Sequence, residues 1–408
     1  MSDSLKKVWM IAPTPFFSDR GCHVRILEEI YALKEQDITV DLFTYHLGRD
    51  IEGVHTIRTI KIPWYNKKSP GPSYHKLYLD VFLFITCLFK LFKSKNRPVV
   101  LHGHLHEGAF IAIFLKIFIK VPVIFDVQGS LVDELQSHKF IKKGKLLYKL
   151  FYSLESFIYK KSDHLIVSSK YTADLIKSNF NVSKDKVTVI MDGVNNKYLS
   201  MDTSGNQKIE LLRKMGIPGG KTIIGYLGAL NVYQGIEILL DIIKKISLTS
   251  EIHQLHFLIM GYPNVEKYKT LAQELNIEGY VTFTGKVAYE KINSLLSIVD
   301  IAVTPKISLT EANGKVINYM TMGLPIVAFN TPVNQQYLGE DYEYFANLNQ
   351  EDSFKNCLLR MLHDGPEKWT RIGAGFKARV FEEFNMGQIA EKILEVYEHE
   401  NDNVSYKK

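Results

Sequence analysis

The chain has 408 residues, of which 46% are hydrophobic and 23% charged, which argues against disorder and favours two domains. Its net charge of +6 is uneven, because residues 1–200 hold 29 Lys+Arg against 19 Asp+Glu and residues 201–408 hold 21 against 25. The basic half is therefore expected to meet something anionic: phosphate, acidic lipid or nucleic acid. Three scattered cysteines, Cys22, Cys87 and Cys357, favour a reducing compartment over a disulfide framework or a structural zinc site.

The N-terminal region shows no signal-peptide pattern. Its first apolar stretch, VWMIAPTPFF, contains two prolines and predicts a strand that runs into a loop. The most apolar segment, VFLFITCLF (81–89), is nine residues long, about half of what a membrane span needs. We therefore expect a soluble or peripheral protein.

Short apolar segments alternate with amphipathic helical patterns in the first half of the chain, as in doubly wound α/β domains. A helical pattern covers 23–35, with apolar residues at helical spacing. The predicted strands are KVWMIAP (7–13), ITVDLFTY (38–45), TIRTIKIP (56–63), PVVLHGH (98–104), VPVIFDV (121–127), HLIVSS (164–169) and KVTVIM (186–191).

The pattern restarts after a polar stretch at 198–208, which predicts a linker. We expect two Rossmann-like domains, 1–200 and 201–385, facing a central cleft, with a final helical segment at 386–408 that returns to the first domain. The strands predicted for the second domain are TIIGYLG (222–228), LHFLIMG (255–261), YVTFTG (280–285), DIAVTP (300–305) and LPIVAF (324–329).

Three glycine-bearing loops each follow a predicted strand and precede a helix. In PTPFFSDRGCHVRI (13–26), Gly21 lies beside Arg20 and Arg25, just before a helix expected to start near His23. A helix N-terminus with a nearby glycine can bind an anion. The alternative interpretation of this segment is an ordinary strand–helix turn with two solvated arginines.

The second loop lies in GYLGALNVYQGIEILL (225–240), where Gly228 and Gly235 flank the turn. The third lies in EANGKVINYMTMGLPIVA (311–328). There Lys315 could reach an anion above the helix start at Gly314, and Asn318, one turn on, could hydrogen-bond a polyol such as ribose.

The order of these segments resembles the GT-B glycosyltransferases of family 4. The C-terminal likeness is carried by YLGALNVYQGIEILL, FLIMGYPNVEKY, VTFTGKVAYEKINSLLSIVDIAVTPK and GKVINYMTMGLPIVAFNTPVNQQYLG. DGVNNKYL (192–199) resembles the family's interdomain segment, and SDHLIVSS and the HxH strand at 102–104 resemble strands of its acceptor domain.

The resemblance implies an α/β GT-B fold and a retaining, hexosyltransferase-type reaction. A nucleotide-diphosphate-sugar, UDP- or GDP-linked, would bind mainly to the second domain, with no metal and no further cofactor. The acceptor would be a glycan or a lipid-linked saccharide in cell-surface polysaccharide or glycoconjugate synthesis, and the location cytoplasmic. Such a site must stabilise negative charge growing on a leaving diphosphate, which helix N-termini, Lys and Arg can do.

The chain departs from the family pattern at several positions. The family's diphosphate-clamping Arg and Lys correspond to Ala229 and Gln234, and Asn318 replaces the second glutamate of its motif, while Glu311 stands for the first. The resemblance to a subgroup with this Lys/Asn pattern implies that Lys306 and Lys315 take over the phosphate role. The histidine usual after the fifth strand is replaced by Gln128.

Candidate residues near the reacting carbon are His104, Asp126 and Gln128, at predicted strand ends in the first domain. A structural histidine is the alternative for His104, and His102 and His106 compete with it. Alternate histidines in HGHLHE share a strand face and could bind a metal, but the sequence shows no partner cluster of acids or cysteines.

The stretch KFIKKGKLLYKLFYSLESFIYKK (139–161) has seven lysines and one acid, Glu155. One interpretation is a core helix with a basic solvated face, its apolar face formed by Leu146, Leu150, Leu154 and Phe157. The other is a patch that docks on anionic lipid at the inner face of the membrane, with 76–95 as a second element. Nucleic-acid binding is disfavoured, because no recognised nucleic-acid-binding module accompanies this positive charge.

Three other functions share the same architecture. A non-catalytic member would bind a nucleotide or a partner transferase, in keeping with the missing Arg, Lys and Glu. A nucleotide-sugar epimerase would act without an acceptor. A glycogen- or sucrose-type transferase would use a soluble acceptor.

Overall fold

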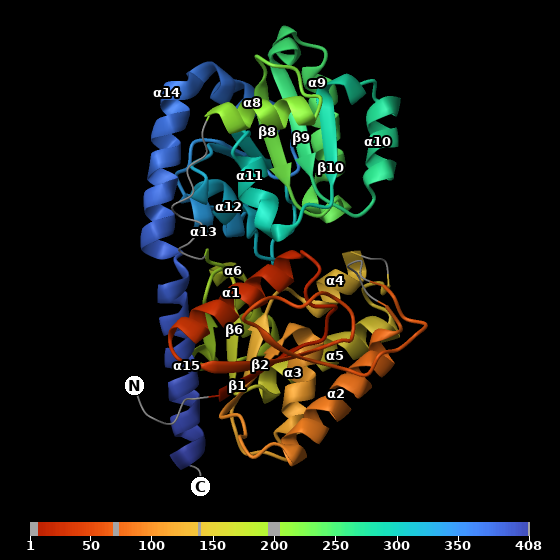
Figure 1. Ribbon diagram of the computed structural model, residues 1–408, viewed down its shortest axis with the longest axis vertical. Helices are drawn as coiled ribbons and strands as arrows, with labels where there is room; N and C mark the ends of the chain where they lie inside the picture. The colour runs from red at the N-terminus through yellow and green to blue at the C-terminus, as the bar shows by residue number, and fades with distance from the viewer. Residues whose placement is uncertain (1–6, 68–72, 138–139, 195–204, 407–408) are drawn as a thin grey trace. The chain divides into compact units, whose positions relative to one another are not determined.

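A computed structural model describes residues 7–67, 73–137, 140–194 and 205–406 (Figure 1). The chain divides into two compact units. Unit 1 comprises Met1–Asp192, Thr310–Ala312 and Met386–Lys408, and unit 2 comprises Gly193–Leu309 and Asn313–Asn385. The expected border between residues 200 and 201, and most of the DGVNNKYL segment, lie outside the described residues.

Unit 1 is built on a seven-stranded parallel sheet with the order β3-β2-β1-β4-β5-β6-β7. All seven predicted strands are present, although the third is shorter than predicted. The strands are near-continuous apolar runs because helices cover both faces of a parallel sheet. Their bounds are β1 Lys7–Ala12, β2 Thr39–Thr44, β3 His55–Arg58, β4 Val100–His104, β5 Val123–Val127, β6 His164–Val167 and β7 Val187–Val189.

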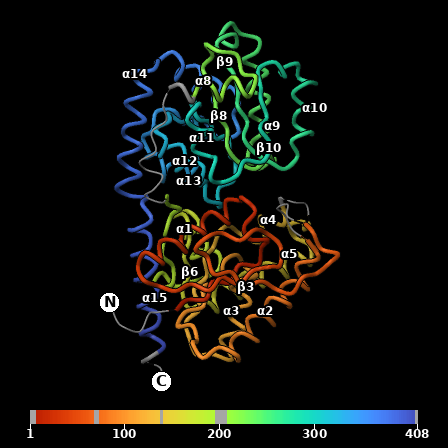
Figure 2. The backbone as a smooth tube through the Cα atoms, viewed as in Figure 1, coloured from red at the N-terminus to blue at the C-terminus, as the bar shows by residue number. Residues whose placement is uncertain are grey.

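The helices of unit 1 lie on the two faces of this sheet (Figures 1 and 2). On one face, α2, α3, α5 and α6 pack over strand residues such as Trp9, Leu101 and Phe125. On the other, α1 and α15 pack against each other and contribute side chains that bond β4 and β5. Their bounds, with η for a 3-10 helix, are α1 Gly21–Glu35, α2 Lys76–Lys93, α3 Leu105–Leu115, α4 Leu131–Ser137, α5 Leu146–Lys161, α6 Lys170–Phe180, η1 Lys184–Lys186 and α15 Met386–Tyr406.

Unit 2 repeats the architecture with a six-stranded parallel sheet in the order β10-β9-β8-β11-β12-β13. Its five predicted strands are confirmed, and within the described part of the unit the sequence missed only the two-residue edge strand. In both sheets the strand order reverses beside the first strand, and ligands of open α/β sheets bind at that point, beyond the carboxyl ends of the strands. The bounds are β8 Thr222–Leu227, β9 Leu255–Met260, β10 Val281–Gly285, β11 Ile301–Thr304, β12 Ile326–Phe329 and β13 Phe345–Ala346.

The core of unit 2 forms where α9 and α14 pack on the sheet. The helix α9 buries six apolar residues on one stripe, as its spacing predicts. The helix α14 is interrupted at Gly365, whose φ of 76° is not helical. The bounds are α8 Gly205–Lys214, η2 Val232–Gln234, α9 Ile236–Ile246, η3 Ser250–Gln254, α10 Val265–Glu274, η4 Glu278–Tyr280, η5 Tyr289–Lys291, α11 Ile292–Leu296, α12 Lys315–Thr321, α13 Pro332–Leu338 and α14 Glu351–Glu383.

The helix α5 corrects one expectation. One of the two interpretations of residues 139–161 placed the face of Leu146, Leu150, Leu154 and Phe157 in the core. Leu154 is half-buried against the core, yet Leu146 is 82% and Leu150 61% exposed. The core side is formed instead by Glu155, Ile158 and Tyr159. Among the described residues, no helix combines the length and the apolar character that crossing a bilayer requires.

Candidate functional site

Two histidines and an aspartate lie at the ends of neighbouring strands on the α1 side of the first sheet. His102 and His104 alternate along β4, and their rings stack with centroids 4.4 Å apart. The register of the sheet pairs His104 with Asp126 of β5, and His104 Nδ1 lies 3.1 Å from Asp126 Oδ2. The sequence predicted both residues, and the parallel pairing of their strands brings them together.

The buried side chain of Arg25, from α1, holds this aspartate. Its Nε and Nη2 donate to the Asp126 carboxylate at 2.7–3.1 Å, and its Nη1 donates to Asp192 Oδ1 at 2.7 Å. Its Nε also lies 3.1 Å from Glu29 Oε1, one helical turn on. The alternative of a solvated Arg25 is therefore wrong, because the helix turns this residue onto the sheet.

Burial and charge set the protonation of the cluster. Although burial alone raises it, the Arg25 guanidinium and the bond from His104 hold the pKa of Asp126 below its usual range. Burial, with repulsion from Asp126, raises the pKa of Glu29 well above its usual value. Burial beside His104 lowers the pKa of His102, whose Nδ1 lies 2.6 Å from the hydroxyl of Tyr397 on α15. At neutral pH we therefore expect an ionised Asp126 and a neutral His102.

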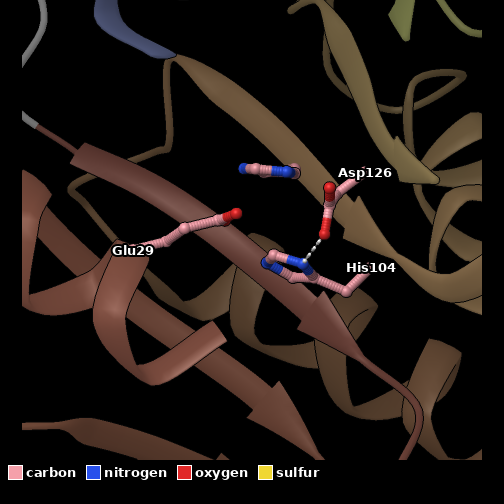
Figure 3. Close-up of side chains that lie close together, drawn as sticks. Glu29, His104 and Asp126 are labelled. Atoms are coloured by element: carbon pink, nitrogen blue, oxygen red, sulfur yellow. Dashed lines mark hydrogen bonds and ion pairs between the residues drawn. The ribbon is translucent and has the colours of Figure 1, made fainter. Parts of the chain in front are cut away.

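The same four side chains offer a possible ligand set for a metal. Glu29, His102, His104 and Asp126 are fully or nearly fully buried, and their ligand atoms lie within 4.8 Å of one another. Figure 3 shows Glu29, His104 and Asp126, with the contact between His104 and Asp126 dashed. The expectation that acids are missing around HGHLHE was wrong, because α1 and β5 supply them. However, the Arg25 guanidinium already pairs with both carboxylates, so the cation position is occupied by a side chain.

Gln128, just after β5, points back to the cluster and donates from Nε2 to Asp126 Oδ2 at 2.8 Å. His106 lies apart from it. As the second residue of α3, it contacts Tyr159 at 3.3 Å and Glu155 at 3.4 Å on the opposite side of the sheet.

The first glycine-bearing loop is organised around His23. Its ring lies 2.6 Å from Thr14 Oγ1 and accepts from the Ser18 backbone N–H at 2.9 Å. The helix α1 begins at Gly21, two residues before the predicted start, with Arg20 at its N-cap position. A Cβ on Gly21 would meet nothing within 4 Å, so there is open space at the helix start.

In unit 2, Lys315 joins the second and third glycine-bearing loops. From the first turn of α12 its Nζ lies 2.8 Å from Gln234 Oε1 and 4.5 Å from the centre of the Tyr226 ring. A Cβ on Gly228, whose φ is +148°, would lie 2.8 Å from the same Nζ. These residues meet where β8 and β11 end, the point at which the strand order reverses.

The other predicted donor-site residues lie in the segment between β11 and α12 or in α12 itself. Lys306 is buried two residues beyond β11, Gly314 is the N-cap residue of α12, and Asn318 is half-buried one turn into that helix. The buried Asn313 fixes the loop before α12, because its Nδ2 donates to Thr304 Oγ1 at 2.9 Å and to Asn334 Oδ1 at 2.7 Å. Glu311 belongs to the short segment Thr310–Ala312, which groups with unit 1.

Sequence reasoning missed several residues of these clusters. Glu29 and Tyr397 appeared only as positions in helical patterns, since nothing in their neighbourhood signals a buried polar partner. The signal for Arg25 was available: it lies on the apolar stripe of its helix, between Val24 and Ile26. Tyr226 and Asn313 flank the glycines that were identified, but only the folded loop shows that they contact the lysine or fix its helix.

Comparison with known proteins covers both halves of the chain. The model "Glycosyltransferase Family 4" matches residues 20–198, and "Glycosyl transferases group 1" matches residues 207–379. An uncharacterized glycosyltransferase of Methanocaldococcus jannaschii is 26% identical over 73% of this chain and 74% of its own.

Solved structures agree in fold. Sucrose-phosphate synthase from Thermosynechococcus elongatus superposes with a TM-score of 0.80 at 19% identity, over 97% of this chain and 98% of that one. Anabaena HepE in complex with UDP-glucose gives a TM-score of 0.74 at 14% identity, over 96% of this chain and 99% of that one. The chain belongs to the GT-B glycosyltransferases of family 4, the group 1 glycosyltransferases.

Proposed function

We propose that this protein is a retaining, metal-independent hexosyltransferase. It moves a sugar from a nucleotide-diphosphate-sugar to a glycan or a lipid-linked saccharide in the synthesis of a cell-surface polysaccharide or glycoconjugate. The observation that carries the proposal is the position of Lys315 over the glycine-bearing end of β8, beside Gln234 and Tyr226. In this proposal the second domain binds the nucleotide-sugar and the first domain binds the acceptor.

The chemistry of the leaving group supports the role of Lys315. Departure of a nucleoside diphosphate leaves growing negative charge on phosphate oxygens, and a fixed ammonium group beside them stabilises it. Gly228 allows a ligand to approach the backbone closely, since it carries no Cβ. A UDP-sugar is favoured over a GDP-sugar because Anabaena HepE, which shares the fold, was solved with UDP-glucose.

The remaining residues receive roles around this donor. In unit 2 we assign Lys306 and Gly314 to the diphosphate and Asn318 to the ribose. Gln234 orients Lys315 through the bond at 2.8 Å, so it serves as a positioning residue in place of the family's clamping lysine.

In the first domain we assign His104, Asp126 and Gln128 to the neighbourhood of the reacting carbon. Among the described residues, His104 Nε2 has no hydrogen-bond partner, while its Nδ1 is held by Asp126. Such a histidine is fixed in orientation and keeps one nitrogen for a substrate hydroxyl. Glu311 is proposed for the donor sugar, and Gly21 with Arg20 for a phosphate at the start of α1.

Nucleotide binding tests the proposal directly. A thermal-shift panel of UDP, GDP, ADP, CMP and their sugar conjugates should show one base that raises the melting temperature, because a ligand that binds only the native state stabilises it. Lys315→Ala should weaken that ligand about 10- to 100-fold, the loss of one charge-assisted hydrogen bond. Lys291→Ala, at an exposed lysine elsewhere in unit 2, is the matched control. Unchanged affinity in Lys315→Ala would overturn the assignment.

A second function is favoured by one specific feature. Ala229 and Gln234 stand where many family members carry the cations that clamp the diphosphate, so a non-catalytic nucleotide-binding or partner protein is the alternative. It would bind the donor yet neither hydrolyse nor transfer it. An epimerase would instead convert the nucleotide-sugar without any acceptor.

A further inference from the structure

The outward surface of α2 is apolar, in addition to the side that packs in the core. Leu79, Leu83, Cys87 and Leu91 face the sheet. A surface helix normally presents polar residues on its opposite side. Here the opposite side is a stripe at helical spacing, each member 50–74% exposed: Leu77, Val81, Ile85, Phe89 and Phe92.

Two neighbouring helices extend this stripe. The last turn of α3 exposes Phe114, and the turn after it exposes Ile117 and Phe118. The helix α5 exposes Leu146, Leu147, Leu150 and Phe157. We call all these side chains, with the stripe of α2, the α2–α3–α5 face. The three helices lie side by side in unit 1 (Figures 1 and 2).

Ring contacts connect parts of this face across the three helices, in one place through the half-buried Phe110. Phe92 of α2 lies 6.1 Å from Phe118 after α3, and Phe110 lies 4.8 Å from Phe114 and 6.4 Å from Phe157 of α5, measured between ring centroids. Contiguous exposed apolar surface of this kind marks an interaction site in a folded protein.

Positive charge borders the face. Exposed basic side chains lie at and after the end of α2, after α3, just before α5, and in the first and last turns of α5. They are Lys93, Lys95, Arg97, Lys120, Lys142, Lys143, Lys145, Lys149, Lys160 and Lys161.

The acids of α2, α3 and α5, and Asp163 just after α5, point inward or pair with lysine. Asp80 of α2 bonds the buried Tyr45 at 2.5 Å, and the buried Glu155 of α5 accepts from Tyr159 at 2.8 Å. Glu107 and Asp163 bond Lys76 and Lys116 at 2.5–2.6 Å. The charge displayed around the apolar face is therefore predominantly positive.

We propose that the α2–α3–α5 face docks this protein on an anionic lipid surface. Large apolar side chains enter the boundary between headgroups and acyl chains, while the lysines around them meet acidic headgroups. A second copy of the chain fits less well, because a symmetric contact would bring the same basic borders together.

The position of the face in the fold is compatible with a working enzyme. It lies on the α2, α3 and α5 side of the first sheet, whereas His102, His104 and Asp126 lie on the α1 and α15 side. Docking would therefore engage the opposite side of the sheet from the polar cluster. The inference rests on the proposed function only for its lipid-linked acceptor, since docking itself can be measured without transfer.

Vesicle flotation tests the docking. The full chain should float with phosphatidylcholine vesicles that contain phosphatidylglycerol, much less with phosphatidylcholine alone, and less as salt is raised. Ile85→Ser/Phe89→Ser/Phe92→Ser should abolish flotation. Lys142→Gln/Lys143→Gln should lower the partition coefficient about 30-fold, since each lysine near such a surface contributes about fivefold.

Matched controls use exposed residues of unit 2. Leu248→Ser/Phe381→Ser removes apolar side chains that are 76% and 67% exposed, and Lys214→Gln/Lys269→Gln removes exposed lysines. Both controls should float like the unaltered chain. Equal flotation of the face variants and the controls would overturn the proposal.

Light scattering decides between lipid and a second copy. A concentration-dependent dimer that the serine variant abolishes, in a chain that does not float, would also overturn the lipid proposal. Thermal shifts with nucleotides, run on the same variants, separate this inference from the proposed function. Flotation without any nucleotide response would refute the transferase and leave the docking intact.

Discussion

Replacement of Arg25 by methionine should destabilise unit 1 strongly. The guanidinium donates to Asp126 at 2.7–3.1 Å and to Asp192 at 2.7 Å, and its Nη2 also donates to the carbonyl oxygen of Ile190 at 3.2 Å. Methionine keeps an unbranched side chain but leaves the fully buried Asp126 carboxylate without its cation. Breaking a buried pair in this way costs about 3–5 kcal/mol, a large part of the roughly 5–15 kcal/mol by which domains are stable.

Urea unfolding gives the total loss, and hydrogen exchange of peptides from β4 and β5 assigns it to unit 1. Adding Asp126→Asn to Arg25→Met should recover part of the loss, because the unpaired carboxylate is then removed as well. Arg49→Met is the matched control: the Arg49 side chain is 43% exposed and pairs with one carboxylate, Asp19, at 2.9 Å, so this change should cost clearly less than Arg25→Met. A loss below about 1 kcal/mol for Arg25→Met, or a double variant no more stable than the single one, would refute the reasoning.

Two further predictions concern pH and the donor loop. Because burial raises the pKa of Glu29, the folded state keeps a proton that the unfolded state releases. The stability gained from this proton is complete below about pH 4.3, the pKa of an unperturbed glutamate, and is lost as the pH rises. Glu29→Gln should remove this pH-dependent loss. In urea unfolding, the free energy of unfolding of the variant should exceed that of the unaltered chain by a margin that grows by up to about 1.4 kcal/mol per pH unit. A difference that does not change with pH would contradict the assignment. Gly228→Ala should displace the Lys315 ammonium group, since the new methyl would lie 2.8 Å from it, and so weaken nucleotide binding about tenfold. In thermal-shift titrations the control Gly279→Ala, with nothing within 4 Å, should bind normally, and equal affinity of both variants would count against the donor loop.

The alternation of apolar segments and helical patterns was sufficient to predict the two parallel α/β units. Twelve strands could be located because each is a short apolar run between turn signals, and a strand buried on both faces tolerates little else. Only the two-residue β13 escaped, since so short a segment carries no period. The order of motifs was likewise enough for the family, and the glycines and Lys315 were located from their place after strands.

Only the tertiary structure decided which polar groups meet. Arg25, Glu29, His102 and Asp126 come from three elements, and their contacts depend on strand register and on how α1 lies on the sheet. These are properties of packing that no local pattern records.

The sequence was equally unable to predict which face of each helix is buried. In α5 most of the regular apolar stripe is exposed, at Leu146, Leu150 and Phe157. Glu155 is buried instead, because it bonds Tyr159 and the backbone N–H groups that begin α4. Periodicity shows that a helix has an apolar face, but the free energy of burying it depends on what the fold places opposite. Sequence thus determined the elements and the family, and packing decided the charges of the site and the surface left for a partner.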